Sequence, residues 1–220
     1  GSEMCIRDRD NTIDDLIVSD LVNLLRPGDR LVLNNTKVIP ARLSGTRTRT
    51  ISPKNIVTAK IAINLIERIA KDTWLALVKP LRKLDLGEII DLGLGLNAKI
   101  THKSNGTATL CFNKSGQELD DSLYAIGSMP LPPYIEKKRS ADLRDVVDYQ
   151  TIWAKEPGSV AAPTASLHFD KELLTKLKRL GVTITFVTLH VGAGTFLPVK
   201  VDDISEHQMH PEIGYISETA

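Results

Sequence analysis

The sequence predicts an α/β protein that carries a small antiparallel β-barrel or sandwich. Short segments rich in Ile, Val and Thr recur from about Leu43 to Asn113, with Gly, Pro, Asn and Asp between them. Strands of this length and spacing are typical of a small barrel or sandwich. Further along the chain, a predicted helix ending at Leu180 precedes the apolar stretch VTITFVTLH (182–190). A helix followed by an apolar strand indicates an α/β layer.

The N-terminal residues show no helical or strand periodicity. The first ten, GSEMCIRDRD, resemble a tag remnant joined to translated adapter sequence, so we treat residues 1–12 as a leader outside the fold. Ordered structure is expected to begin near Ile13. Ser19 is the expected N-cap of a short helix, whose apolar face consists of Leu21, Val22, Leu24 and Leu25.

Two extended segments are expected next. RPGD (26–29) is a turn signal, and RLVLNN (30–35) after it reads as a strand. KVIPARL (37–43) resumes an extended conformation, although Pro40 itself does not fit a central strand position.

The second half of the chain mixes rigid, charged and helical segments. MPLPPYI (129–135) is expected to be extended, since its prolines make it too rigid for a helix, and EKKRSADLRD (136–145) is expected to be exposed. Asp170 is the expected N-cap of a helix that Gly181 ends as the C′ residue. The expected buried face of this helix consists of Leu173, Leu174 and Leu177.

The composition is that of an ordinary globular protein. The 220 residues are 42% hydrophobic and 25% charged, which suits one large domain or two small ones. No apolar run approaches the length that crosses a membrane. The two cysteines, Cys5 and Cys111, lie far apart and in no metal-ligand spacing, so free thiols in a reducing compartment are expected. Because no secretory signal is recognisable, we expect a cytoplasmic location.

Charge is unevenly distributed, although the net charge is +1. Between Lys37 and Asp85, eleven cations stand against three anions, a local balance of +8. From Val201 to Ala220 there are five acidic residues and no Lys or Arg. A basic region can be a site for a polyanion. A solvated surface with alternating charges explains the same composition.

The stretch TLHVGAGTF (188–196) places a histidine and a small glycine loop after a predicted strand. His190 stands at the carboxyl end of that strand, where ligands bind in open α/β sheets. Gly192 and Gly194 would let backbone N–H groups approach a ligand. The loop matches neither the dinucleotide fingerprint nor a P-loop. A plain strand-end turn therefore fits as well as a nucleotide loop.

Two further stretches carry candidate functional groups. PGSVAAPTASLHF (157–169) is rich in small residues, and its backbone amides and the Thr164 hydroxyl are suited to line a pocket that ends in His168. EHQMHPE (206–212) brings His207, His210 and Glu212 close together in the sequence. Two histidines at i, i+3 can bind a metal, but Pro211 interrupts the helix that this needs and no third ligand follows. Metal binding is therefore the minor alternative.

The stretch NNTKVIPAR (34–42) holds two adjacent asparagines at a predicted strand end. Asn34 and Asn35 have Lys37 and Arg42 nearby. Asparagine side chains can recognise the edge of a purine. They are also ordinary turn residues.

Taken together and in this order, six motifs resemble one known family. They are PGDRLVLNNTKVIPARL, MPLPPYI, YQT, PGSVAAPTASLHFD, FVTLHVGAGTF and HQMHPE. They look like the S-adenosylmethionine:tRNA ribosyltransferase-isomerase family of queuosine biosynthesis, from about Leu21 to Glu212. The resemblance implies an αβα sandwich interrupted by an inserted small antiparallel β-barrel. The expected division is residues 13–42 and 116–220 for the sandwich and 43–115 for the barrel.

The resemblance also implies an activity. Enzymes of this family transfer and isomerise the ribosyl group of S-adenosylmethionine onto 7-aminomethyl-7-deazaguanine at the tRNA wobble position. The products are epoxyqueuosine in tRNA, adenine and methionine. S-Adenosylmethionine is a consumed substrate, so no metal or other cofactor is implied. The expected partners are tRNA and S-adenosylmethionine, with no membrane, and the chain is expected to be a monomer; the alternative function is a non-catalytic RNA-binding fragment that uses the basic barrel.

This chemistry moves several protons, and imidazoles titrate near neutral pH. We therefore expect four histidines and one carboxylate around the reacting centre: His168, His190, His207, His210 and Glu212. The expected substrate-binding residues are Asn34, Asn35, Arg42, Thr164, Gly192, Gly194 and Thr195.

The chain also departs from the family pattern. Lys37 stands where the family commonly has Arg, and Ser159 and Ser166 replace residues usually seen as Ala and Gly. The family's N-terminal LP…LIA and R…SRLL patterns and its GTTSVR-like and TNFHLP-like motifs are absent. We therefore expect a fragment with an incomplete α/β layer, exposed apolar surface and low activity.

Overall fold

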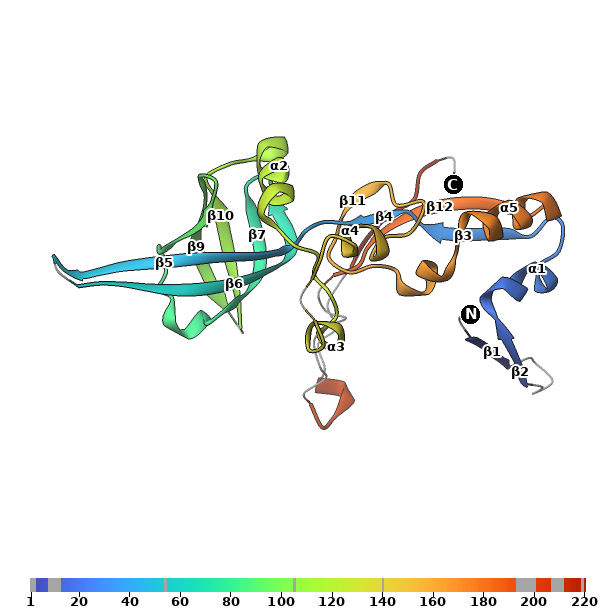
Figure 1. Cartoon of the computed structure of the whole chain (residues 1–220), viewed down its shortest axis with the longest axis horizontal. Helices are drawn as coiled ribbons and strands as arrows, with labels where there is room; N and C mark the ends of the chain where they lie inside the picture. The colour runs from blue at the N-terminus through green and yellow to red at the C-terminus, as the bar shows by residue number, and fades with distance from the viewer. Residues whose placement is uncertain are drawn as a thin grey trace.

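The computed structural model shows an elongated molecule with a β-barrel at one end and an α/β region at the other (Figure 1). It describes the backbone of residues 3–7 and residues 13–53, 55–104, 106–139, 141–192, 201–206, 212–218 and 220. Over these ranges, no helix is long and apolar enough to cross a bilayer.

The N-terminal segment forms a hairpin followed by one turn of helix. β1 (Glu3–Arg7) pairs antiparallel with β2 (Ile13–Ile17), so the expectation that the leader contributes no strand is wrong. Backbone hydrogen bonds pair the two strands of a hairpin, so a hairpin can form without a recognisable side-chain pattern. Next come η1 (Val18–Asp20) and α1 (Leu21–Leu24). Ser19 lies inside η1 and is not the cap; instead, the Asp20 carboxylate accepts a hydrogen bond from the Ile17 N–H at 3.0 Å.

A parallel strand pair forms the centre of the α/β region. β3 (Arg30–Asn34) pairs with β12 (Thr183–His190) in the register Thr183 to Arg30, and β13 (Ile213–Tyr215) pairs antiparallel with the other edge of β12. Beside them, β4 (Thr36–Val38) pairs in parallel with β11 (Glu156–Ser159). This arrangement confirms the predicted α/β class.

Helix α5 (Lys171–Leu180) covers one face of the β3–β12 pair. As predicted, the Asp170 carboxylate accepts from the Leu173 N–H at 2.7 Å, and Gly181 ends the helix with φ of +92°. Leu173 and Leu177 are buried, and α1 and Leu31 pack against them. The apolar face predicted for α1 is correct except for Leu24, which is 41% exposed.

The strand 182–190 is less buried than predicted. Phe186 is 39% and Leu189 is 38% exposed, and Val32 on β3 is 54% exposed. Phe186 pairs with Leu33 and therefore shares the face of Leu31, next to α5, whereas Val32 and Leu189 project from the opposite face, since residues alternate between faces along a strand. Within the described residues this face has no covering helix, which is why the apolar strand is only half buried.

Six antiparallel strands form a closed barrel in the order β10-β7-β6-β5-β8-β9. This confirms the barrel and removes the sandwich alternative. The strands are β5 (Arg42–Ser52), β6 (Asn55–Ala70), β7 (Thr73–Lys79), β8 (Ile89–Gly93), β9 (Leu96–Ser104) and β10 (Thr107–Phe112), with η2 (Leu81–Lys83) after β7. The long β5–β6 hairpin extends beyond the barrel (Figure 1).

Inward-facing apolar residues alternate along each strand and fill the barrel. Ile61, Ile63 and Leu65 on β6 are all 2% exposed or less. Gly45 allows β5 to approach β8, because a Cβ at this position would lie 2.6 Å from the carbonyl oxygen of Asp91. Helix α2 (Gly116–Ile126) adds Leu119 and Leu123 to the same core.

A largely irregular segment leads from α2 back to the α/β region. It contains α3 (Pro133–Glu136), α4 (Asp145–Asp148) and η3 (Thr164–His168), and η5 (Ile204–Glu206) follows β12. The expectation that 129–135 is wholly extended is therefore wrong at its end. Proline is tolerated in the first helical turn because no N–H is needed there. The stretch 136–145 is not wholly exposed either, since Asp145 is 2% exposed and pairs with Arg139.

Candidate functional site

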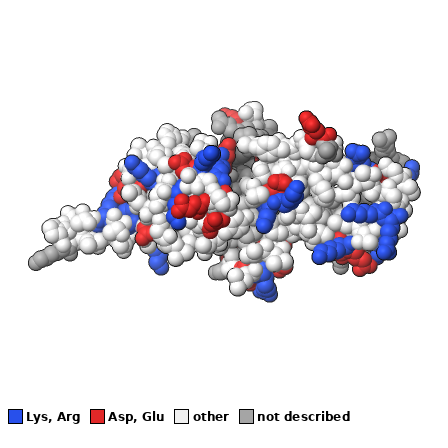
Figure 2. All heavy atoms as spheres, turned by 90° about the horizontal axis from the view of Figure 1, so that it is seen from above, with Lys and Arg blue, Asp and Glu red and all other residues white. Residues whose placement is uncertain are grey.

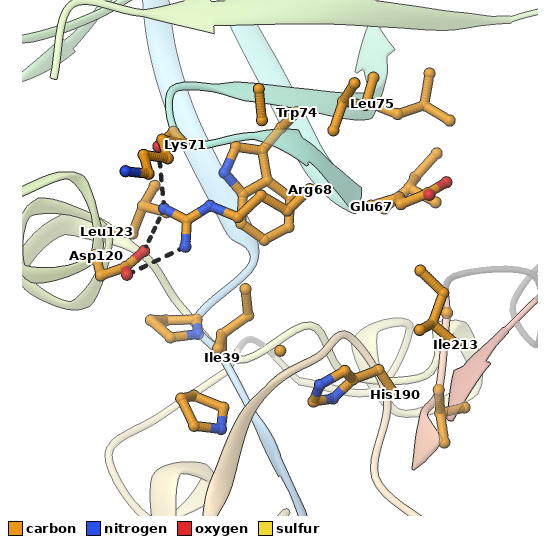
Figure 3. Close-up of a pocket in the computed structure, with 18 of the residues that line it drawn as sticks. Ile39, Glu67, Arg68, Lys71, Trp74, Leu75, Asp120, Leu123, His190 and Ile213 are labelled. Atoms are coloured by element: carbon orange, nitrogen blue, oxygen red, sulfur yellow. Dashed lines mark hydrogen bonds and ion pairs between the residues drawn. The ribbon is translucent and has the colours of Figure 1, made fainter. Parts of the chain in front are cut away.

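A cavity of about 750 Å³ lies where the barrel meets the α/β region. Its barrel wall comes from the β6–β7 turn and α2, and its other wall comes from β11, β12 and β13 (Figure 3). The polar and aromatic lining residues are Glu67, Arg68, Lys71, Trp74, Gln117, Asp120 and Tyr124 on the barrel side and His190, Glu212 and Tyr215 on the other. A cavity of this size holds a ligand as large as a nucleoside derivative.

His190 stands at the end of β12 and is held from several sides. Its Nδ1 lies 2.8 Å from the hydroxyl oxygen of Thr36, and the ring of Tyr215 meets it edge to face at 6.1 Å. A Cβ at Gly158 would lie 2.8 Å from Cε1 of the imidazole, so only glycine fits against this ring face. Burial lowers the pKa of His190 below its ordinary value, and the charge of Glu156 opposes that shift in part.

Asn34 and Asn35 fasten the end of β12. The Asn34 amide nitrogen donates to the Leu189 carbonyl at 2.9 Å, and its amide oxygen accepts from the Leu189 N–H at 3.0 Å. The Asn35 amide oxygen accepts from the Thr188 hydroxyl at 2.6 Å. Both side chains therefore position the strand that carries His190, while their contact with a substrate stays a prediction.

Three of the predicted site residues meet in the cavity. His190, Gly192 and Glu212 all line it, and the Gly192 N–H donates to the Glu212 carboxylate at 3.1 Å. That contact ties the segment after β12 to the start of β13.

The structure does not bring the remaining predicted residues into this cavity. Thr164 and His168 lie exposed on η3, outside the cavity lining, and Arg42 forms an ion pair with Glu136 at the start of the barrel. Gly194, Thr195, His207 and His210 lie outside the described residues. Among the residues that are described, no group of three His, Cys, Asp or Glu is placed to hold a metal.

The barrel wall contains functional groups that the sequence did not suggest. The Arg68 guanidinium lies over the Trp74 ring at 5.4 Å and pairs with Asp120 at 2.8 Å (Figure 3). Arg68 and Trp74 are cross-strand neighbours on β6 and β7. The turn at Lys71 and Asp72 is a sequence signal for this pairing, but the register shifts in β6 hide the partner.

Ion pairs neutralise much of the positive charge of the basic segment 37–85. Four of its arginines pair with carboxylates: Arg42 with Glu136, Arg47 with Glu88, Arg49 with Asp85 and Glu88, and Arg68 with Asp120. Three of these acids come from outside the segment, which composition cannot show. On one face of the molecule, basic and acidic side chains lie close together rather than in one basic area (Figure 2). Lys60, Lys79 and Arg82 form no ion pair within the described part of the chain.

Fold and site together define a two-part protein, with a barrel and an α/β region that meet at a histidine-lined cavity of ligand size. The family model described as "Queuosine biosynthesis protein" matches residues 2–220, and the chain belongs to this family.

Curated relatives of the chain carry one name, S-adenosylmethionine:tRNA ribosyltransferase-isomerase. The relative from Ruegeria pomeroyi is 57% identical over 212 residues, covering 96% of this chain and 60% of the relative. The relative from Jannaschia sp. is 57% identical over 206 residues, covering 94% of this chain and 58% of the relative. The chain thus spans about 60% of the length of the curated relatives it matches.

A solved structure is also similar to the chain. It is the crystal structure of S-adenosylmethionine tRNA ribosyltransferase from Thermotoga maritima, 29% identical, with a TM-score of 0.33. The match covers 86% of this chain and 51% of the other.

Proposed function

We propose that the chain acts in transfer and isomerisation of the ribosyl group of S-adenosylmethionine onto 7-aminomethyl-7-deazaguanine in tRNA. The products are epoxyqueuosine in tRNA, adenine and methionine. The observation that carries the proposal is the cavity of about 750 Å³, in which His190 faces a barrel wall with aromatic side chains and both acidic and basic groups. The names of relatives that are 57% identical point to the same reaction.

The cavity suits the chemistry of the proposed donor. S-Adenosylmethionine combines a flat purine, a ribose, an apolar methylene chain and charged groups. Trp74 and Tyr124 offer aromatic surface, and Ile39, Ile66 and Leu123 offer apolar surface around the charged Arg68 and Asp120. S-Adenosylmethionine is consumed as a substrate, and we propose no metal or other cofactor.

The proposed acceptor is a base in the anticodon loop of tRNA. A base in a loop can leave its stack and enter a cavity, where an enzyme reaches its reactive group. Lys71 lines the cavity, and the Lys37 ammonium lies 6.0 Å from the ring of Tyr124 in its wall. Neither lysine forms an ion pair within the described part of the chain, so both are suited to contact the phosphate backbone. Binding of tRNA should therefore weaken as salt rises. Because this tRNA is a cytoplasmic substrate, we propose a cytoplasmic location. We also propose that the chain is a monomer.

The test is release of adenine from S-adenosylmethionine. The chain is incubated with tRNA that carries the aminomethyl base, and adenine is quantified by chromatography. The matched controls are the same tRNA without the aminomethyl group and the relative from Ruegeria pomeroyi, which is 57% identical. We expect adenine release only with the modified tRNA. If the relative releases adenine while this chain binds tRNA without turnover, the chain is a non-catalytic RNA-binding protein and the proposal is wrong.

A further inference from the structure

Thr36 is buried behind His190 and is itself fixed in place. Its side chain is fully buried, with a relative exposure of 0%. The Thr36 N–H donates to the Asn34 amide oxygen at 3.1 Å, and Thr36 is the residue of β4 that pairs with Glu156 of β11. The hydroxyl oxygen is thereby held 2.8 Å from Nδ1 of His190, 154 positions away in the sequence. This contact joins the strand-end motif NNT directly to the site.

The hydrogen atoms of this contact can be counted. A threonine hydroxyl has one hydrogen to donate, and a neutral imidazole has one N–H and one lone pair. Among the described residues, Nδ1 of His190 is the one hydrogen-bond partner of the Thr36 hydroxyl. If Nδ1 carried the imidazole hydrogen, the buried hydroxyl would have no acceptor, which costs about 1–3 kcal/mol. The hydroxyl therefore donates to Nδ1, and the imidazole hydrogen resides on Nε2.

We infer that Thr36 is a positioning residue that fixes His190 as the Nε2–H tautomer, so that His190 offers the ligand a hydrogen-bond donor instead of a basic lone pair. His190 lines the cavity, and its Nε2 has no protein partner in the described part of the chain. The matching ligand atom is an acceptor, such as a purine ring nitrogen or a ribose oxygen.

The surroundings of the ring support this assignment. Gly158 lies against one face of the imidazole, and Tyr215 meets its edge, so the ring cannot rotate freely. The ionisable groups on neighbouring elements are Glu156 on β11, Tyr215 on β13 and Glu212 beside Gly192. Burial lowers the pKa of His190, which keeps the imidazole neutral at neutral pH and preserves a single N–H.

This role changes how His190 serves the proposed reaction, and that part of the inference rests on the proposed function. A fixed Nε2–H does not remove a proton from the substrate. It donates a hydrogen bond to negative charge that develops on an acceptor atom, as on a departing purine, and the Nε2–H bond stays intact. The base that removes protons is then a different group.

The tautomer is measured directly by ¹⁵N-histidine NMR on the chain without ligand, above neutral pH. The His190 signals are assigned by their loss in His190→Gln. We expect a protonated Nε2 and an unprotonated Nδ1 for His190 in the wild type and in Thr36→Ser. Thr36→Val, which lacks the donor, should give a mixture of tautomers. A wild-type spectrum with Nδ1–H for His190, or with equal tautomers, overturns the inference whether or not the Thr36 variants fold.

Kinetics give the second readout. Thr36→Val should lower kcat for adenine release by roughly 10–100-fold with little change in KM, while Thr36→Ser restores it. The matched control is Thr151→Val, since Thr151 is also buried, at 5% exposure, and its hydroxyl has no described partner. Equal loss in both valine variants would show a merely structural role. Absence of adenine release by the wild type would contradict the proposed function and leave the NMR result standing.

Discussion

The barrel and the α/β region differ in how completely they bury their own cores. The barrel closes on itself, and its inward residues, such as Ile63 and Leu110, are 0% exposed. The β13-β12-β3 sheet is open, and Val32 and Phe186 on it remain 54% and 39% exposed. A closed sheet has no unpaired edge, whereas an open one depends on what covers its faces. The histidine of the cavity therefore stands on the less completely packed of the two regions.

The largest expected effect comes from removing a core side chain of the closed barrel. Ile63→Ala removes a fully buried side chain from β6 and should lower the free energy of unfolding by about 3–4 kcal/mol. The matched change on the open sheet is Val32→Ala at 54% exposure, which should cost less than about 1 kcal/mol. Urea unfolding followed by circular dichroism measures both. Equal losses of unfolding free energy would show that side chains of the barrel and of the open sheet are equally well packed.

An intermediate effect comes from filling the space against His190. Gly158→Ala places a Cβ 2.8 Å from the imidazole and strains a backbone with φ of +149°. It should lower the free energy of unfolding by about 1–3 kcal/mol and displace the ring, so adenine release should fall as well.

The control for that substitution is Gly28→Ala. Gly28 has φ of +92°, but a Cβ there would meet no atom within 4 Å. The control should therefore lose stability through backbone strain alone and keep its rate of adenine release. If both variants lose turnover equally, Gly158 does not act through the imidazole.

The smallest effect concerns the irregular segment that connects the two regions. Arg139 hydrogen-bonds the buried Asp145 carboxylate and lowers its pKa from 3.8 to about 2. Because the folded pKa lies below the unfolded value, this pair stabilises the protein above about pH 4. That contribution, on the order of 1 kcal/mol with a partly exposed Arg139, should be lost as pH falls towards 2.

Urea unfolding between pH 5 and the acid limit of stability measures this contribution, and Asp145→Asn is the reference. The difference in stability between wild type and variant should shrink as pH falls. A difference that stays constant over this range would mean that Asp145 does not titrate with folding. The barrel should show no such dependence when Ile63→Ala is compared over the same range.

Local signals predicted the elements that depend on neighbours in the sequence. Asp170, the leucine spacing and Gly181 specified α5 from end to end, since caps and helical periodicity act within a few residues. Short segments rich in Ile, Val and Thr, separated by turn residues, predicted the barrel strands for the same reason. The β1–β2 hairpin was missed, because its pairing is not marked by an alternating pattern in the leader.

The site was only partly predictable. His190 was identified from its place at a strand end, and Glu212 from a nearby histidine motif. Arg68 and Trp74 were missed because strand alternation assigns them no ligand. Thr36 lies inside a recognised motif, between the two predicted extended segments, where nothing in the sequence marks it as part of the site. The sequence suggested free cations where the structure has ion pairs, because the acidic partners come from distant segments; these residues are Arg42, Arg47, Arg49 and Arg68.

The sequence by itself determined the α/β class, the inserted barrel, the ends of α5 and the family, because each depends on local pattern or on motif identity. Only the tertiary structure decided which groups share the cavity. Its walls come from segments at residues 39–40, 66–75, 116–124, 157–158, 190–192 and 212–215, and the Thr36 hydroxyl meets His190 across 154 positions. Such contacts follow from how β4, β12 and the barrel pack against one another, and no local periodicity encodes that packing.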